Sequence, residues 1–545
     1  MPDSSINTIE QTPLLSVAEL TVIFNGHVKV VDRINFSINS GETFALVGES
    51  GSGKSMTALS VLRLLPHNAQ ITAQHINLTN INLLAEPESA LCKIRGQRIG
   101  FIFQDPMSSL NPVMTIGEQI AEAIQIHTPL KKNALQQRVL NLLQDVEIPT
   151  PEQRIKDYPH QLSGGQRQRV MIAIALAGNP DLLIADEPTT SLDVTLQAQI
   201  LTLLKNLQRQ YGMALWFISH DLALVSTIAN RVAVMQKGKI VEIGTAKQVL
   251  HNPQHPYTQK LIAALPTIHS VDHKTTPQSR AISPLLQVKN FSCYYPIRKG
   301  LFKRIVDYIK AVDDVSFNIA RGKTLALVGE SGCGKTTLGK SLLHLIPSNS
   351  GQVIIDDIIL NNLTGDELRQ QRANIQIIFQ DPFSSMNPRM LVGDVISEGL
   401  RALFPQISQQ ERQQRVRTLL AEVGLPDDAA WRYPHEFSGG QRQRICIARA
   451  LAVEPKLIVC DEPTSALDVS IQAQIIDLLK KLQKEKGVRY LFISHDLAVV
   501  AEMSDEIAVM YKGKIIEYGS AAQVLKQPQH AYTQKLLAAF PDAKH

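Results

Sequence analysis

An internal repeat limits the fold of this chain more than any other feature of its sequence. The segment "FALVGESGSGKSM" in the first half returns as "LALVGESGCGKTT" in the second half. Lys54 and Lys335 lie 281 positions apart, and matched residues further along the chain keep a spacing of 275 or 276. The sequence therefore predicts two copies of one domain with small differences in their loops.

The position of the repeat also predicts the domain boundaries. Between the copies, the stretch "PTIHSVDHKTTPQSRAISP" is rich in Pro, Ser and Thr and lacks apolar periodicity, which is typical of a linker. We expect a first domain over residues 14–266, a linker over residues 267–284 and a second domain over residues 285–541. A chain of 545 residues is also too long for one hydrophobic core.

Composition and charge exclude several classes of protein. The formal net charge of +5 is small for this length, so nucleic acid is not expected as the main partner. No apolar run approaches the roughly 20 residues of a membrane span, and the first residues lack the pattern of a secretion signal. The five cysteines are scattered singly, which favours reduced thiols. We expect a cytoplasmic chain that crosses no membrane.

Each copy predicts an α/β core with a helical subdomain. The runs "TFALVG", "RIGFIF", "DLLIAD" and "ALWFISH" are apolar, short and ended by polar or glycine-rich turns, as in strands that are buried on both faces of a sheet. Between Gln104 and Ser163 the apolar residues instead follow a longer, helical period.

Two glycine-rich loops predict binding of nucleotide phosphates. The strings "GESGSGKS" and "GESGCGKT" follow apolar strands and match the pattern GxxxxGK[ST]. Backbone N–H groups of such a loop surround phosphate, the lysine reaches the outer phosphates, and the final hydroxyl can ligate magnesium. The predicted nucleotide-binding residues of these loops are Gly48, Glu49, Ser50, Gly51, Ser52, Gly53, Lys54, Ser55 and Met56, and Gly329, Glu330, Ser331, Gly332, Cys333, Gly334, Lys335, Thr336 and Thr337.

Carboxylate pairs at the ends of two other apolar strands predict hydrolysis. In "LLIADEPTT" and "LIVCDEPTS", Asp186 and Asp461 suit magnesium, and Glu187 and Glu462 are suited to activate the attacking water. His220 and His495 each follow a further apolar strand. Either histidine alone could be a structural cap, but their matched positions in the repeat favour a catalytic role.

The order of motifs resembles the ATP-binding cassette (ABC) family twice over. The phosphate loop is followed by "FQDP", "SGGQ", "DEPT", "SLD" or "ALD", and "SHD", and the resemblance covers almost the whole chain. It implies two tandem ABC ATPase domains that bind ATP and Mg²⁺. It also implies that Gln104 and Gln380 sense magnesium, the attacking water and a membrane partner, that His220 and His495 contact the γ-phosphate, and that Asp193 and Asp468 communicate across the dimer. The implied metal set is Ser55, Gln104 and Asp186, with Thr336, Gln380 and Asp461 in the second copy.

The same resemblance gives roles to an aromatic ring and to the serine-glycine-glycine turns. An aromatic ring stacks on adenine in this family, and Phe24 and Tyr295 stand at the expected positions, although Tyr294 is a rival and each ring could belong to the core. The turns of the family cap the ATP that the opposite domain holds. Ser163, Gly165 and Gln166 would then close over nucleotide on Lys335, and Ser438, Gly440 and Gln441 over nucleotide on Lys54.

The tails narrow the resemblance to importers. "NPQHPYTQKLIAALP" and "QPQHAYTQKLLAAFP" resemble a segment of ATPases that serve oligopeptide, dipeptide, nickel and glutathione importers, although Ala531 replaces the usual proline. The fused halves most resemble Yej-type ATPases of bacterial peptide importers, which also admit microcin C, and the glutathione-importer ATPase is the nearest rival. This implies two membrane permease subunits, a solute-binding protein and a peripheral position on the cytoplasmic face of the inner membrane. The iron–sulfur cysteine cluster of some relatives has no counterpart in this chain.

Other interpretations remain open at this stage. Twin cassettes also occur in ribosome-associated translation factors, but these usually carry a long, charged helical linker, and an export ATPase is disfavoured by the tails. The basic insertion at residues 298–304 could meet lipid headgroups, although a solvated hairpin is the simpler interpretation. Cys333 is either a small buried spacer or, beside Lys335 and a helix start, a reactive thiolate.

Overall fold

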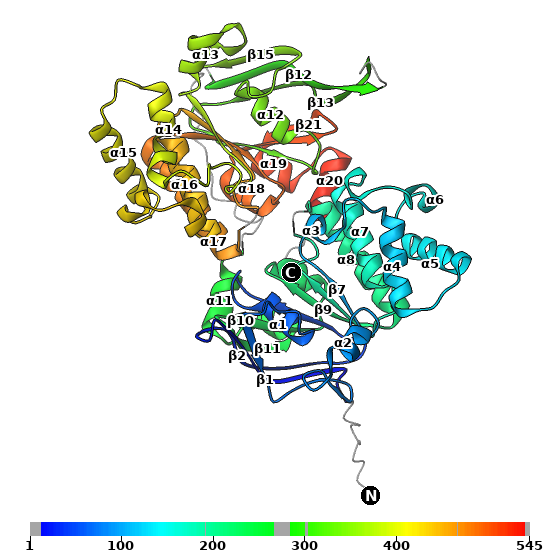
Figure 1. Cartoon of the computed structure of the whole chain (residues 1–545). Helices are drawn as coiled ribbons and strands as arrows, with labels where there is room; N and C mark the ends of the chain where they lie inside the picture. The colour runs from blue at the N-terminus through cyan, green and yellow to red at the C-terminus, as the bar shows by residue number, and fades with distance from the viewer. Residues whose placement is uncertain (1–11, 191, 266–283, 300–303, 466, 540–545) are drawn as a thin grey trace, which may run out of the picture. The chain divides into compact units, whose positions relative to one another are not determined.

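The computed structural model describes residues 12–190, 192–265, 284–299, 304–465 and 467–539. These residues form two compact units, one from each half of the chain (Figure 1). Nearly all of the predicted linker, and residues 300–303 of the basic insertion, lie outside the described residues.

The core of the first unit is a mostly parallel sheet. Its order is β11-β10-β3-β9-β8-β7, and only the pairing of β10 with β11 is antiparallel. Every residue of β3, β8 and β9 is buried, which explains why these strands are continuous apolar runs. The strands are β3 (Thr43–Val47), β7 (Ile99–Ile102), β8 (Leu182–Asp186), β9 (Ala214–Ser219), β10 (Arg231–Gln236) and β11 (Lys239–Thr245).

A second, antiparallel sheet completes the core of the first unit. Its order is β2-β1-β5-β6, with β4 also paired to β1. Apolar residues of both sheets enter one hydrophobic cluster, in which the Phe36 ring stacks on Phe44 with 5.5 Å between centroids. The strands are β1 (Leu15–Phe24), β2 (Val28–Ile38), β4 (Ala69–Thr72), β5 (His75–Leu78) and β6 (Ile81–Asn82).

The predicted helical subdomain follows β7. Thr115 begins α4 with a capping box, and α4 and α5 bury apolar residues at helical spacing, such as Ile120 with Ile124 and Val139 with Leu142. Figure 1 draws α4, α5 and α7 as one group of helices. The subdomain contains α3 (Pro106–Ser109), α4 (Ile116–His127), α5 (Lys132–Asp145), α6 (Pro151–Arg154), η1 (Pro159–Gln161) and α7 (Gly164–Ala175).

Further helices cover the core sheet, and two of them form the tail. The helix α1 (Lys54–Val61) follows the phosphate loop, and α2 (Glu88–Ile94) precedes β7. Two more, α8 (Val194–Tyr211) and α9 (Leu222–Ile228), follow β8 and β9. The tail contains α10 (Ala246–His251) and α11 (Pro256–Ala263).

The second unit repeats this architecture, as the sequence predicts. Its mostly parallel sheet has the order β17-β18-β19-β14-β20-β21, and its antiparallel sheet the order β13-β12-β15-β16. The strands are β12 (Leu286–Lys299), β13 (Arg304–Ile319), β14 (Leu325–Val328), β15 (Ser350–Ile355), β16 (Ile358–Ile359), β17 (Ile375–Ile378), β18 (Leu457–Asp461), β19 (Arg489–Ile493), β20 (Glu506–Tyr511) and β21 (Lys514–Ser520).

The helices of the second unit follow the same order. In the core and tail they are α12 (Lys335–Leu342), η3 (Leu360–Asn362), α13 (Gly365–Gln371), α17 (Val469–Lys486), α18 (Leu497–Met503), α19 (Ala521–Lys526) and α20 (Ala531–Ala538). In the helical subdomain they are α14 (Val392–Leu403), α15 (Gln409–Glu422), η4 (Asp427–Trp431), η5 (Pro434–Glu436) and α16 (Gly439–Leu451).

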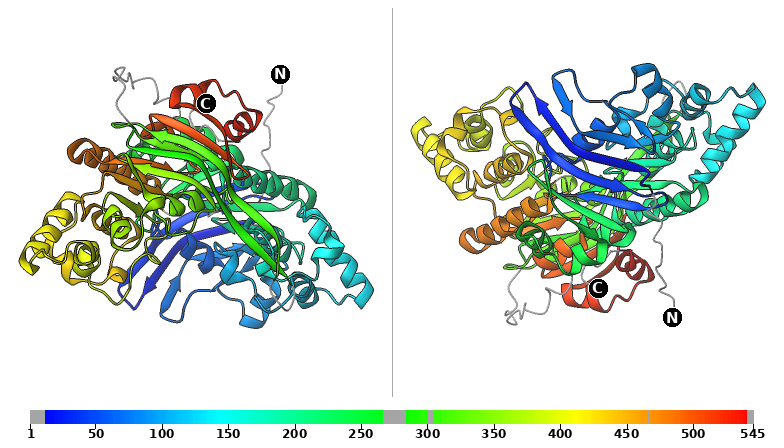
Figure 2. Two further views of the ribbon diagram at one scale, coloured as in Figure 1. Left: turned by 90° about the horizontal axis from the view of Figure 1, so that it is seen from above. Right: turned by 90° about the horizontal axis from the view of Figure 1, so that it is seen from below.

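The insertion in the second copy lengthens one hairpin. The strands β12 and β13 have 14 and 16 residues, whereas β1 and β2 have 10 and 11. Figure 2 shows each pair as long, curved strands, blue in the first unit and green in the second. The added part of β13 exposes Ile305, Val306, Tyr308 and Ile309. The insertion is therefore an extended, partly apolar hairpin in the residues that the structure describes.

Within the described ranges, no helix combines the length and the apolar character that crossing a membrane requires.

Candidate functional site

The carboxyl ends of the parallel strands bring the predicted catalytic residues to one edge of each core sheet. In the first unit β3 leads into the phosphate loop, β7 toward Gln104, β8 ends at Asp186 and β9 is followed by His220. Neighbouring parallel strands end at the same edge, which is where ligands bind in open α/β sheets. Residues that are more than 80 positions apart in sequence therefore meet there.

The phosphate loops (residues 48–55 and 329–336) depend on glycine because other backbone atoms crowd them. A Cβ at Gly48 would lie 2.2 Å from the Met235 carbonyl oxygen, and one at Gly334 would lie 2.0 Å from that of Ala311. Gly53 and Gly334 also have φ values of 106° and 113°, which L side chains rarely adopt. Both loops therefore keep their backbone close to the strands behind them.

The lysine of each phosphate loop turns back onto the loop itself. Lys54 is only 4% exposed, and its Nζ donates to the carbonyl oxygens of Gly48 at 2.7 Å and of Glu49 at 3.0 Å. Lys335 donates to Gly329 and Glu330 at the same two distances. Each loop thus holds a buried ammonium group against carbonyl oxygens, where an anion can later compete for it.

The hydroxyl that ends each phosphate loop meets the first strand-end carboxylate. The Ser55 hydroxyl donates to Asp186 at 3.0 Å, and that of Thr336 donates to Asp461 at 2.9 Å. Burial and the charge of Glu187 raise the pKa of Asp186 to about 6, and burial also raises the pKa of Asp461. Each hydroxyl–carboxylate pair therefore offers oxygen ligands at a position where the negative charge of the carboxylates is not fully neutralised.

Glu187, the predicted general base of the first unit, contacts the side chains of three other residues. Burial alone would raise the pKa of Glu187, but His220 and Lys54 lower it to about 2. His220 Nδ1 lies 3.1 Å from Glu187 Oε1, and Gln104 and Thr190 donate to Oε2, both at 3.0 Å. Glu187 also has a φ of 47°, an uncommon backbone conformation that aims its side chain.

The second unit reproduces the glutamine and histidine contacts, whereas Ser465, at the position of Thr190, donates to the backbone carbonyl of Glu462. Gln380 donates to Glu462 Oε2 at 2.9 Å, His495 Nδ1 lies 3.2 Å from Oε1, and Glu462 has the same φ of 47°. Burial opposes the ionised forms, yet their contact lowers the pKa of Glu462 and raises the pKa of His495. The second unit therefore holds the glutamate as an ion pair with histidine, and in the first unit the same short contact lowers the pKa of Glu187.

The signature turns (residues 163–166 and 438–441) begin helices of the helical subdomains. Ser163 accepts a hydrogen bond from the Gln166 amide, and the Gln166 side chain accepts one from the Ser163 amide, which forms a capping box. Ser438 and Gln441 form the same box. Both serines are exposed, so each turn presents a hydroxyl and a helix N-terminus to its surroundings.

The candidate adenine-stacking rings lie at the ends of the long strands. Phe24 is half-buried at the end of β1 and packs against the core. Tyr295 is 39% exposed on β12, whereas the neighbouring Tyr294 donates its hydroxyl to Asp313 at 2.6 Å and lies under Lys310. These contacts favour Tyr295 over Tyr294 as the ring that is free to stack.

Cys333 is a buried spacer of the second phosphate loop. It is 7% exposed, and burial raises the pKa of its thiol although Lys335 opposes this effect. The sequence-based hypothesis of a reactive thiolate is not supported, because the loop excludes solvent from the sulfur.

We therefore expect maleimide to label Cys333 at least about tenfold more slowly than Cys92 in the folded protein, because Cys92 is exposed. Peptide mapping after timed labelling measures both rates. Cys92→Ser should remove the fast phase, and a fast phase that survives in this variant but disappears in Cys333→Ser would contradict the expectation.

Sequence reasoning missed the contact between each tail and its phosphate loop. The Tyr257 hydroxyl accepts a hydrogen bond from the Glu49 amide at 3.4 Å, and the Tyr532 hydroxyl accepts one from Glu330 at 3.0 Å. The two tyrosines are 275 positions apart, which is also the spacing of the predicted catalytic glutamates and histidines, and this was the one available signal.

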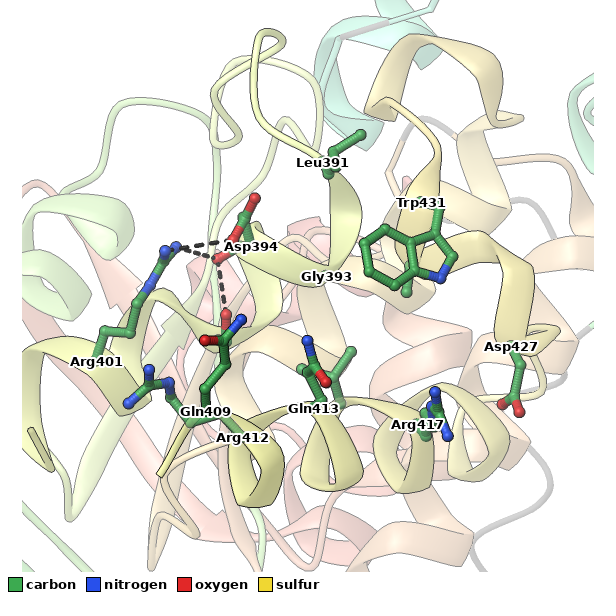
Figure 3. A pocket seen from close by; sticks show the side chains of 13 residues that line it. Leu391, Gly393, Asp394, Arg401, Gln409, Arg412, Gln413, Arg417, Asp427 and Trp431 are labelled. Atoms are coloured by element: carbon green, nitrogen blue, oxygen red, sulfur yellow. Dashed lines mark hydrogen bonds and ion pairs between the residues drawn. The ribbon is translucent and has the colours of Figure 1, made fainter. Parts of the chain in front are cut away.

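A separate hollow of about 340 Å³ lies in the second helical subdomain, away from the residues above (Figure 3). Side chains of α15 line one side, and Trp431 of η4 stands above them with 67% of its surface exposed. On α14, Arg401 and Asp394 form an ion pair at 3.3 Å. The first unit has Lys156 at the position of Trp431, so the residue above this hollow differs between the two copies.

Comparison with known proteins identifies the family. A family model described as "ABC transporter" matches residues 31–190 and 312–465. The chain belongs to the ABC transporter family. A second model, described as "Oligopeptide/dipeptide transporter, C-terminal region", matches residues 241–298 and 516–545. The predicted tandem ABC ATPase domains are therefore confirmed, and domains of this family bind ATP.

Full-length relatives of this ABC transporter chain agree with the family assignment. The "Peptidoglycan transport ATP-binding protein YejF" of Agrobacterium fabrum is 50% identical over 535 residues, which cover 97% of this chain and 96% of the relative. The "Glutathione import ATP-binding protein GsiA" of Escherichia coli is 46% identical over 574 residues, covering 100% and 92%. The GsiA protein of Pectobacterium atrosepticum is 47% identical over 560 residues, covering 97% and 90%. The prediction of an ABC importer ATPase is confirmed, and such a subunit implies membrane permease partners.

Proposed function

We propose that this ABC ATPase powers the import of peptides into a bacterial cell. The observation that carries the proposal is the oligopeptide/dipeptide transporter region, which matches the tail of both units. The YejF relative, named for peptidoglycan transport, supports a peptide-containing cargo, of which microcin C-like peptides are one type. Glutathione, itself a small peptide, is the second candidate because the GsiA relatives are named for its import.

In this proposal each phosphate loop holds ATP, with Mg²⁺ on the oxygen atoms beside it. Ser55 and Asp186, with Gln104, offer the hard oxygen ligands that Mg²⁺ prefers, and Thr336, Gln380 and Asp461 offer the same set. The raised pKa of Asp186 supports this assignment, because a buried carboxylate beside Glu187 favours an added cation. When bound, Mg²⁺ neutralises charge on the phosphates.

Glu187 and Glu462 then act as general bases toward the attacking water. At rest, contacts with the histidine and the charge of the nearby lysine lower the pKa of each glutamate and make it a weak base. A γ-phosphate that draws His220 or His495 to itself removes this partner, so the pKa of the glutamate rises. The glutamate can then accept a proton from water at the moment when substrate is in place.

We further propose that the signature turns act in trans. The exposed hydroxyls of Ser163 and Ser438, with the amides of the following helix N-termini, suit the charge of a nucleotide phosphate. Neither turn has a lysine of its own, so each needs the phosphate loop of the other copy. ATP would then join the two cassettes, and hydrolysis would release them.

The proposed partners are two permease subunits and a solute-binding protein, with the ATPase at the cytoplasmic face of the inner membrane. Exposed apolar side chains near the proposed catalytic glutamines suit a permease contact. Phe103 precedes Gln104, Met107 and Val113 follow it, and Phe383 follows Gln380. In the second unit, the hollow under Trp431 would receive a permease segment, because exposed tryptophan and arginine side chains are typical anchors of protein interfaces.

We expect Trp431→Ala to lower recovery of the permeases with this chain at least about fivefold, because it removes the largest apolar surface of the hollow. The ATPase rate of the isolated chain should stay within about twofold of the parent. Quantitative co-purification measures the effect. Ile358→Ala, which removes an exposed apolar side chain of the antiparallel sheet, is the matched control, and an equal loss for both variants would contradict the docking proposal.

The proposed function is tested by what the tagged chain binds and by what a deletion strain fails to import. Co-purification with two membrane proteins, and loss of peptide uptake in the deletion strain, are the expected results. Co-sedimentation with ribosomes at physiological salt would support the alternative class of twin-cassette ATPase. Loss of glutathione uptake with normal peptide uptake would favour the second candidate cargo.

A further inference from the structure

Each tail reaches the phosphate loop of its own unit through one tyrosine. The Tyr257 hydroxyl, on the first turn of α11, accepts from the Glu49 amide at 3.4 Å. The Tyr532 hydroxyl, on the first turn of α20, accepts from the Glu330 amide at 3.0 Å. The same contact forms in both copies of the repeat, at matched positions of the tail and the loop.

A chain of hydrogen bonds fixes each tyrosine in place. Glu517, on β21, accepts from the amides of Gln529 at 2.8 Å and His530 at 3.1 Å, and His530 Nδ1 then accepts from the Tyr532 amide at 3.1 Å. In the first unit Glu242 and His255 make the same contacts. These hydrogen bonds therefore hold the turn before each tail helix against the edge strand of the core sheet. The backbone that carries the tyrosine side chain is fixed as a result.

The tyrosine and the catalytic lysine meet at a single residue of the loop. The amide of Glu330 donates to Tyr532, and its carbonyl oxygen accepts from Lys335 at 3.0 Å. Glu49 is held in the same way between Tyr257 and Lys54. Phosphate competes for the lysine when nucleotide enters. The turn of the loop itself, in which the Cys333 amide donates to the Glu330 carbonyl oxygen at 3.3 Å, and the tyrosine then hold this residue, and the tyrosine is the contact that comes from outside the loop.

We propose that Tyr257 and Tyr532 are positioning residues that brace the phosphate loops from the importer tails. The proposal rests on the nucleotide sites described under the proposed function, and it gives the tails a direct part in ATP binding. The brace fixes the loop backbone before nucleotide arrives, and this lowers the conformational entropy that the loop loses when nucleotide binds.

The brace is stronger in the second unit. Its hydrogen bond is shorter, and the Tyr532 ring packs on Tyr511 with 4.4 Å between centroids. The first unit has Gln236 at the position of Tyr511. Loss of the hydroxyl should therefore affect the Lys335 site more than the Lys54 site.

The test is Tyr532→Phe in the full-length chain with Lys54→Ala, so that a fluorescent ATP analogue reports the Lys335 site alone. The change keeps the ring and removes the acceptor. We expect affinity to fall about three- to tenfold, the usual effect of one hydrogen bond, with a melting temperature within about 3 °C of the parent. In the matched assay without Lys54→Ala, KM for ATP should rise while kcat changes less than about twofold.

One control separates the hydrogen bond from packing. Tyr511→Phe removes the hydroxyl of the neighbouring ring, which forms no hydrogen bond within the described residues, and it should leave affinity unchanged. An effect of Tyr511→Phe equal to that of Tyr532→Phe would overturn the brace.

A third variant separates this inference from the proposed function. If Lys335→Ala leaves analogue binding unchanged in the Lys54→Ala chain, the nucleotide site itself is wrong and the brace fails with it. If Lys335→Ala abolishes binding while Tyr532→Phe stays within about twofold of the parent, only the brace is overturned.

Discussion

Replacing Glu187 and Glu462 together by glutamine is expected to lower the rate of ATP hydrolysis by about 10²- to 10⁴-fold, the usual contribution of a general base. Glutamine keeps the size of the side chain and cannot accept a proton from water. The phosphate loops and their lysines are untouched, so ATP binding should persist. Phosphate release measures the rate, and retention of labelled ATP on the filtered protein measures binding.

The single variants ask whether both cassettes hydrolyse ATP. Each site has its own glutamate, glutamine and histidine in the same geometry, so either change alone should lower the steady rate to about half or less. Glu122→Gln, an exposed glutamate of α4, is the control and should have no effect. An unchanged rate in Glu187→Gln, together with an abolished rate in Glu462→Gln, would show that only one site is catalytic.

Ser163→Arg is expected to impair nucleotide closure on Lys335, in the other cassette, rather than nucleotide binding on Lys54. The arginine side chain is larger than that of serine and carries a positive charge. It replaces the exposed hydroxyl at the helix N-terminus and removes the capping box with Gln166. We expect trapped nucleotide on the Lys335 site to fall at least about tenfold. Photolabelling with an azido-ATP, followed by cleavage between the halves, assigns the label to each site.

The reciprocal variant and a capping control complete this test. Ser438→Arg should impair the Lys54 site in the same way. Thr115→Ala removes a capping box from α4 of the same subdomain without touching the signature turn, and it should change the label at either site less than about twofold. Loss of label only at the Lys54 site in Ser163→Arg would refute the crossed arrangement.

Local sequence patterns were sufficient to predict the core of both units. The run "TFALVG" is buried at every residue of β3, and the period change after Gln104 marks the helical subdomain that the structure contains. The structure also brings together Gln104, Glu187 and His220, which come from three separate segments. This was predictable because parallel strands end at a common edge, so residues after different strands are neighbours.

Contacts that depend on tertiary packing could not be predicted in this way. Cys333 beside Lys335 favours a thiolate by sequence, but the loop buries the sulfur, and desolvation prevails over the nearby charge. The tail pattern by itself indicates a packed helix, and nothing in it shows that Tyr532 reaches the Glu330 amide more than 200 positions earlier. Such contacts depend on how elements pack, and only the spacing of the repeat indicated that the tyrosines matter.

The most direct test of the central claim is ATP-dependent uptake of a labelled peptide by vesicles that contain the permeases, the solute-binding protein and this chain. The account predicts uptake with the parent chain, and none with the Glu187→Gln, Glu462→Gln double variant, although that variant still binds ATP and the permeases. Uptake by the double variant at the parent rate, or no peptide uptake by the complete parent assembly, would contradict it.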